Sequence, residues 1–142
     1  MLAYSEPAQG VALRSLIGIP FKSRGRDPAE GLDCWGLILH ASRVLYNRAL
    51  PDYPDYENAN DVHDVTPLFG ARRTWKILTP GTEEAGDVVV LTIAGAPTHA
   101  GLVIDARGRM LHTLAQWDSC IDNYRASRWR SRVDGFYKWC LS

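Results

Sequence analysis

The chain has 142 residues, of which 46% are hydrophobic and 23% charged, and its formal net charge is zero. This length and balance predict a single globular domain over residues 1–142, and the neutral charge gives no sign of a nucleic-acid or membrane-surface binder. No run of 18 apolar residues is present, so no transmembrane helix is predicted. The three cysteines are odd in number and lack CxxC spacing, which argues against a disulfide scaffold and a zinc ribbon.

Two helices are predicted in the first half of the chain. The first begins at the N-cap residue Ser5 and ends at the breaker residues 18–21. The second begins after the N-cap residue Asp33, runs to about residue 47 and carries an apolar stripe at helical spacing. Loops are expected at residues 22–31 and 51–56, and a turn or two of helix at 61–68.

The second half of the chain predicts short strands separated by turns. Five strands are expected, at residues 88–93, 98–104, 110–114, 120–124 and 135–139. Residues 105–109 would close a tight hairpin, 127–131 would form a polar turn, and 72–78 are ambiguous. Helices followed by antiparallel strands predict an α+β fold. The second helix should pack on the sheet, because its apolar stripe has no other large partner.

Cys34 is predicted to lie in the first turn of the second helix. A thiol there meets the positive end of the helix dipole and several unpaired backbone N–H groups. Both favour the thiolate, which is the nucleophilic form, and the N–H groups could also hold an oxyanion. The alternative is a small buried cysteine at a helix start, so the case for a nucleophile depends on a base elsewhere in the chain.

Two histidines on neighbouring predicted strands, His99 and His112, are the candidates for that base and its orienting partner. A hairpin turn near residues 105–106 would set them side by side, and a later turn would offset them by a few residues. His99 would accept the thiol proton and later deliver it to the leaving amine, while His112, a nearby aspartate or Gln116 would orient its ring. The other histidines are interpreted as surface or packing residues: His40 and His63.

Five motifs, in this order, resemble those of the NlpC/P60 cysteine peptidases. They are GIPF (18–21), GLDCWGL (31–37), GDVV (86–89), HAGLV (99–103) and LH (111–112). The resemblance implies a papain-like core and hydrolysis of peptidoglycan stem peptides. It also implies that Cys34 is the nucleophile, His99 the base and His112 the third, polar member of the site. No metal or other cofactor is expected, because a thiolate–imidazolium pair works without one.

Three further residues are expected on the substrate side of the site. Asp33 matches a position that recognises the free amine of the substrate in some relatives of this family. Phe21 stands where many relatives have tyrosine, so a hydroxyl that could bind substrate is missing. Trp35 replaces a common serine, so a small hydrogen-bonding group becomes a large apolar wall. Both departures are expected to alter substrate specificity.

The DCWG form of the cysteine motif and the stretch RVDGFYK (132–138) resemble the branch of the family found in phage tails and phage-derived particles. This resemblance implies tail or baseplate proteins as partners besides the peptidoglycan substrate. Residues 1–10 lack the pattern of a signal peptide, so we expect synthesis in the bacterial cytoplasm and incorporation into a tail. The alternatives are a structural tail-tip protein with little activity and an acyl- or amide-transfer enzyme.

Overall fold

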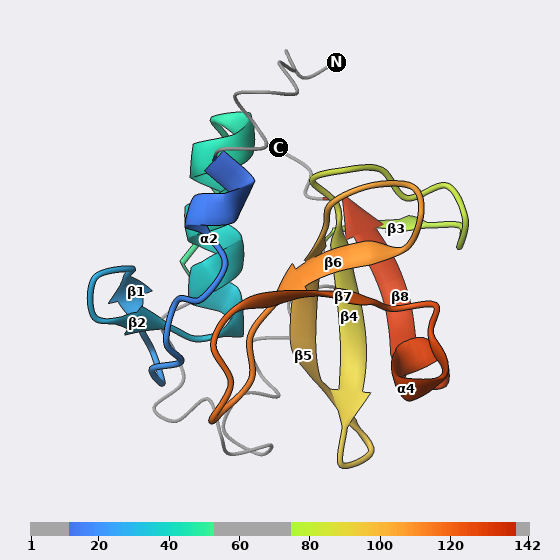
Figure 1. Cartoon of the computed structure of the whole chain (residues 1–142). Coiled ribbons are helices and arrows are strands. Elements are labelled where there is room, and N and C mark those ends of the chain that lie inside the picture. The colour runs from blue at the N-terminus through green and yellow to red at the C-terminus, as the bar shows by residue number, and fades with distance from the viewer. Residues whose placement is uncertain (1–11, 53–74, 139–142) are drawn as a thin grey trace.

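Six antiparallel strands form the main sheet, and helix α2 (Cys34–Tyr46) packs against one of its faces (Figure 1). The computed structural model describes residues 12–52 and 75–138. The strand order is β3-β8-β4-β5-β6-β7, so β8 returns to lie between β3 and β4. The strands are β3 (Lys76–Leu78), β4 (Val88–Ile93), β5 (Ala96–Val103), β6 (Arg109–His112), β7 (Cys120–Asn123) and β8 (Val133–Lys138). The predicted α+β arrangement is confirmed.

Helix α2 begins at the predicted residue and ends one residue before the predicted end. The carboxylate of Asp33 caps it by accepting the backbone N–H of Gly36 at 2.8 Å. Asn47 ends it in the left-handed conformation, with φ of 51°. A side chain at Gly36 would collide with the backbone carbonyl of Gly25, so the helix start lies directly against the preceding loop.

The sheet carries a hydrophobic core on both faces. Side chains of Val88 and Val90 join α2 in the first core cluster, whereas Val89 and Leu91 join a second core cluster on the opposite face. This division follows from the alternation of side chains along a strand. The short helix α4 (Ser127–Arg130) contributes to the second cluster, and Figure 1 shows α2 and α4 on opposite sides of the central strands.

A second, two-stranded sheet lies within the segment predicted to be a polar loop. It consists of β1 (Arg26–Asp27) and β2 (Gly31–Leu32), paired antiparallel. Gly31 has φ of +130°, a conformation that a side chain would strain, and its missing side chain also lets the backbone of residue 20 approach. Strands of two residues carry no periodicity, which is why the sequence predicted only a loop here.

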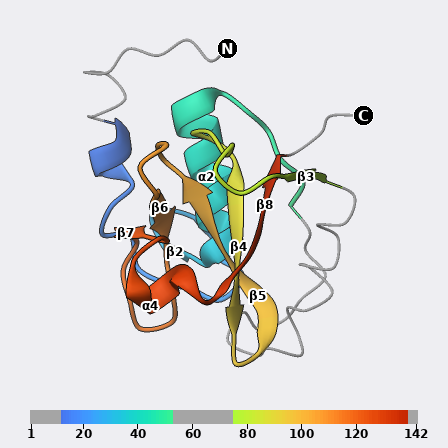
Figure 2. The same ribbon diagram turned by 90° about the vertical axis from the view of Figure 1, so that its right-hand side faces the viewer.

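The C-terminal part of the sheet differs from the prediction in two places. Residues 127–131 were expected as a polar turn, but they contain α4, whose Trp129 is buried. β8 begins at Val133, two residues earlier than predicted. Figure 2 shows α4 close to β7, and the backbone N–H of Ala126 bonds the carbonyl of Asn123 at 3.2 Å.

The remaining boundaries agree with the prediction to within about two residues. β5 begins at Ala96 because the turn before it is made of Ala94 and Gly95, which both have positive φ. β3 falls in the ambiguous stretch 72–78, and residues 12–15 of the first predicted helix are helical. The helix expected at 61–68 lies outside the described residues. Within the described ranges, no helix is long and apolar enough to cross a membrane.

Candidate active site

A buried carboxylate holds the start of α2. The Asp33 side chain accepts the backbone N–H groups of Gly36 at 2.8 Å and Arg24 at 3.0 Å, and it pairs with Arg26 at 2.9 Å. Arg26 also pairs with the more exposed Asp52 at 2.6 Å. Asp33 is fully buried and Arg26 neutralises its charge, so in this structure its role is to cap and hold the start of α2. Contact between Asp33 and the amine of a substrate stays a prediction.

Cys34 follows this cap and is 9% exposed. Backbone hydrogen bonds from Ala100 on β5 and from Trp35 reach its sulfur. Burial, and then the neighbouring Asp33 carboxylate, raise the pKa of the Cys34 thiol to about 12. The thiol is therefore neutral at pH 7, and the predicted acidic thiolate is wrong for this structure. Lost hydration and a nearby negative charge outweigh the N–H groups that favour the thiolate.

His99 and His112 lie in direct contact. His99 Nε2 is 2.9 Å from His112 Nδ1, and the two residues are 2% and 1% exposed. Leu102 pairs with Leu111, so continuing the register places His112 opposite Gly101, two residues from His99. Both rings therefore lie on the same face of the sheet, as diagonal neighbours. The offset arrangement, which the sequence left open, is the one observed.

Asp122 on β7 and Trp129 on α4 complete this group. His112 Nε2 lies 3.5 Å from Asp122 Oδ2, within ion-pair range, and has no hydrogen-bond partner among the described residues. The indole N–H of Trp129 donates to Asp122 Oδ2 at 2.7 Å. The Trp129 ring also packs edge-on against His112 at 5.2 Å and lies 5.8 Å from His99. The four side chains form a continuous chain of contacts, defined here as the His–Asp–Trp chain.

The sequence left open a nearby aspartate as the orienting residue without singling out Asp122, and it did not place Trp129 beside the histidines. A weak signal was present, because His112 pairs with Cys120 and side chains two apart on a strand share a face. That alternation places Asp122 on the same side as His112. No pattern in the sequence indicated that Trp129 would fold back over the imidazoles.

Burial keeps both imidazoles neutral at pH 7. It holds the pKa of His99 well below its usual value, and the neighbouring His112 acts in the same direction. Burial also lowers the pKa of His112 to about 4, although the Asp122 carboxylate opposes this shift. A neutral imidazole has one N–H and one lone pair, so it can accept a proton.

The His–Asp–Trp chain selects one tautomer of each ring. The Asp122 carboxylate faces Nε2 of His112, so the N–H of this ring belongs on Nε2 and its lone pair on Nδ1. That lone pair accepts the Nε2–H of His99. The lone pair of His99 is then on Nδ1, which makes this nitrogen the proton acceptor of the pair.

Cys34 approaches the same strand that carries His99. Ala100, whose backbone bonds the sulfur, follows His99 directly and packs in the first core cluster. The His99 ring packs against Trp129 of the second core cluster. The Cys34 sulfur is thus bonded by the residue that directly follows His99 on β5.

Trp35 and Phe21 have different surroundings. Trp35 is 1% exposed, stacks on Trp75 with ring centroids 5.5 Å apart, and donates its indole N–H to the carbonyl of Pro51 at 2.9 Å. It therefore does not present the apolar wall to substrate that the sequence suggested, because the ring is turned into the core. Phe21 is half-buried, and its backbone forms a bridge with Leu32.

The arrangement matches a known family. The sequence model of the NlpC/P60 family matches residues 18–138, which is most of the chain. The chain belongs to the NlpC/P60 family. Comparison with curated proteins gives no significant match.

Solved structures of NlpC/P60 proteins share the fold at low sequence identity. A Staphylococcus aureus protein, similar to a lipoprotein of the NLP/P60 family, is 17% identical with a TM-score of 0.64, over 98% of this chain and 43% of its own. The NlpC/p60 domain of the peptidoglycan hydrolase SagA is 17% identical with a TM-score of 0.63, over 95% and 99%. RipD from Mycobacterium tuberculosis, a non-catalytic NlpC/p60 protein adapted to peptidoglycan binding, is 16% identical with a TM-score of 0.57, over 97% and 100%. This chain thus spans less than half of the S. aureus protein.

The raised pKa of Cys34 predicts its alkylation behaviour. In a variant that carries Cys120→Ser and Cys140→Ser, the rate of reaction with iodoacetamide should rise about tenfold per pH unit from pH 7 to 9, because the thiolate fraction does so below the pKa. Mass spectrometry of the labelled protein measures this rate. A plateau reached below pH 7 would show an acidic thiolate and contradict the neutral state.

The His–Asp–Trp chain predicts the effect of Asp122→Ala. Removing the carboxylate should lower the pKa of His112 further and let its N–H populate Nδ1, because Asp122 both raises that pKa and favours Nε2–H. Long-range ¹H–¹⁵N correlation spectra of the histidine rings give the ring ¹⁵N chemical shifts, which report the tautomer and its pH dependence. Asp118→Ala, at an exposed position, is the matched control. Unchanged tautomers in the Asp122 variant would show that the carboxylate does not set them.

Proposed function

We propose that the protein is a cysteine peptidase that hydrolyses peptide bonds in peptidoglycan stem peptides. Cys34 is the nucleophile, His99 the base and His112 the third member of the site. The observation that carries this proposal is the buried His99–His112 pair, 2.9 Å apart, in which His99 directly precedes Ala100, the β5 residue whose backbone bonds the Cys34 sulfur. Burying two imidazoles in contact is costly, and a role in proton transfer accounts for it.

The proposed reaction starts from a neutral thiol and a neutral imidazole. As the sulfur adds to the scissile carbonyl carbon, the thiol proton passes to Nδ1 of His99. The new imidazolium of His99 continues to donate its Nε2–H to Nδ1 of His112. The Asp122 carboxylate, beside Nε2 of His112, provides the nearby negative charge that stabilises this cation. Backbone N–H groups at the start of α2 stabilise the oxyanion.

The second half of the reaction returns the site to its starting state. His99 gives its proton to the amine as the C–N bond breaks, which leaves a thioester on Cys34. Water then attacks the thioester while His99 takes one of its protons, and the departing sulfur receives that proton as the acid is released. Phe21 adds no hydroxyl to this chemistry.

Peptidoglycan as substrate is supported by the family and by two of the fold relatives, a peptidoglycan hydrolase and a peptidoglycan-binding protein. Asp33 and Trp35 are both buried beside Cys34, so they support the start of α2 and do not present a solvent-facing surface to the substrate. Since Arg26 already neutralises Asp33, we expect weak selection for a free amine on the substrate.

Cys34→Ala tests the peptidase activity. We expect release of peptides from purified peptidoglycan to fall at least about 10³-fold, because the nucleophile is lost while the helix start keeps its cap. Mass spectrometry of the soluble products measures the release and shows which bond is cut, and a transferred acyl group would indicate the transferase alternative. His40→Gln, on the same helix, should keep activity. Undiminished cleavage by Cys34→Ala would remove the proposal.

A binding role without catalysis is the second candidate. It is favoured by the burial and raised pKa of Cys34, together with the fold likeness to the non-catalytic RipD. In this case the wild-type protein would sediment with purified peptidoglycan but release no peptides from it. Cys34→Ala would then sediment equally well.

The setting in a phage-type tail is a further part of the proposal. It is supported by the DCWG form and the RVDGFYK stretch of the sequence. In this setting the protein is made in the bacterial cytoplasm, meets tail or baseplate proteins and helps the particle to cross the cell wall. The structural alternative is a tail-tip protein with the fold but little activity.

Particle assembly separates these two roles in a tail. Particles that carry Cys34→Ala should assemble in normal numbers and adsorb to cells, but deliver their contents at least tenfold less often if wall hydrolysis is needed. Electron microscopy counts the particles and an infection or killing assay measures delivery. Failure to assemble would instead indicate the structural role, and absence of the protein from purified particles would remove the tail setting.

A further inference from the structure

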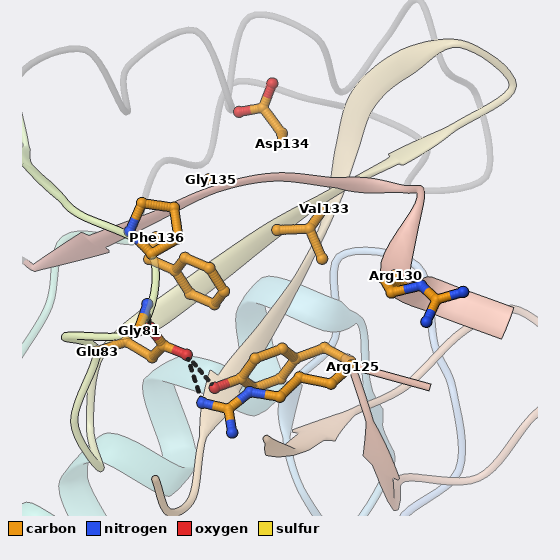
Figure 3. A pocket seen from close by; sticks show the side chains of 10 residues that line it. Gly81, Glu83, Arg125, Arg130, Val133, Asp134, Gly135 and Phe136 are labelled. Atoms are coloured by element: carbon orange, nitrogen blue, oxygen red, sulfur yellow. Dashed lines mark hydrogen bonds and ion pairs between the residues drawn. The ribbon is translucent and has the colours of Figure 1, made fainter. Parts of the chain in front are cut away.

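A cavity of about 480 Å³ opens on the face of the sheet opposite α2 (Figure 3). Its lining comes from the connection before β4, the segment after β7, α4 and β8. Tyr124 and Phe136 of this lining belong to the second core cluster, whereas Cys34 belongs to the first. The lining contains neither Cys34 nor a member of the His–Asp–Trp chain, so the cavity is separate from the candidate active site, and its volume lies in the range of small-molecule pockets.

The inner part of the cavity is apolar. The rings of Tyr124 and Phe136 lie 5.2 Å apart at an angle of 60°, and Figure 3 shows Val133 beside Phe136. Tyr124 and Phe136 are only 1% and 5% exposed, so they form the floor of the cavity, and the half-buried Val133 offers contact area to an aromatic or branched aliphatic group. This part of the cavity thus selects for an apolar group.

Glu83 places a buried carboxylate in the wall, but its oxygens are already bonded. They accept the backbone N–H of Gly81 at 2.6 Å, the hydroxyl of Tyr124 at 2.6 Å and the guanidinium of Arg125 at 3.3 Å. Burial alone would raise the pKa of Glu83, but these donors hold it below its usual value. The carboxylate is ionised and its bonding capacity is largely used, so the cavity is not suited to a cationic ligand.

The rim of the cavity carries two arginines, of which only one is paired. Arg125 is paired with Glu83, whereas the Arg130 side chain makes no ion pair or hydrogen bond to any residue within 12–52 and 75–138. Asp134 points away from the cavity in Figure 3, and its carboxylate accepts the hydroxyl of Tyr137 at 3.1 Å. Arg130 therefore offers a guanidinium at the rim that no described residue engages, while the Asp134 carboxylate on β8 is directed elsewhere.

We propose that this cavity binds a small carboxylate with an apolar body. The apolar group would pack on Val133, above the floor made by Tyr124 and Phe136, and the carboxylate would receive charge-assisted hydrogen bonds from the Arg130 guanidinium. The carboxy-terminal residue of a peptide and a free aryl carboxylic acid share this chemistry. Such a site goes beyond the proposed peptidase activity, because it uses neither Cys34 nor the imidazoles.

A pair of matched ligands tests the proposal. N-acetyl-phenylalanine should bind about tenfold more tightly than N-acetyl-phenylalaninamide, which lacks the negative charge. Isothermal titration calorimetry measures both affinities, and ¹H–¹⁵N NMR should show shifts at the amides of Gly81 and Gly135 in the lining. 3-Phenylpropionate separates the two sources: weaker binding than N-acetyl-phenylalanine indicates a peptide end, and equal binding indicates free acids.

Variants at the rim give the control. Arg130→Gln should reduce the affinity for the acid to that for the amide, and Arg130→Glu should reduce it further. Arg107→Gln, an exposed arginine outside the cavity, should bind as the wild type does. Cys34→Ala should also keep binding, so this test and the test of peptidase activity can fail separately.

Three results would overturn the proposal. They are equal affinities for acid and amide, wild-type affinity in Arg130→Gln, and no binding of the acid at millimolar concentration.

Discussion

The position of the proposed nucleophile depends on one buried ion pair, between Asp33 and Arg26. Leaving a buried carboxylate without its partner costs about 3–5 kcal/mol, whereas a pair as exposed as that of Arg26 with Asp52 contributes about 1 kcal/mol or less. Asp33 is the charge that has to be neutralised, and the β1–β2 hairpin carries the arginine that does so. The same carboxylate caps α2, so the hairpin, the cap and the first turn of the helix are fixed together.

The second constraint is the division of the sheet into two faces. Ala100 faces the first core cluster under α2, while the His99 ring lies with Trp129 over the second. A histidine on that face needs a cover, because an imidazole open to water would not be held in one orientation. Trp129 supplies this cover and also donates its indole N–H to Asp122, so one side chain of α4 both seals and orients the imidazoles.

Much of the framework could be predicted from the sequence, since it depends on local patterns. The N-cap Asp33 and the apolar stripe located α2, and the β-branched run 88–93 located β4. The β1–β2 hairpin and α4 are too short to show a period, so they could not be predicted in this way. Asp122 and Trp129 reach the site through long-range packing. The pKa of Cys34 was predicted in the wrong direction because helix position is local, whereas burial depends on the whole fold.

The chemistry of the site follows from the opposite effects of burial on acids and bases. Removing water disfavours the charged form of every group, so it raises the pKa of the Cys34 thiol and lowers the pKa of His99 and His112. In this structure the site therefore carries neither thiolate nor imidazolium, and in the proposed reaction the two form together as the sulfur attacks a carbonyl. In the proposed reaction the two neutral rings in contact stabilise the positive charge that forms on His99, because His112 accepts its Nε2–H and the Asp122 carboxylate lies on the far side of His112.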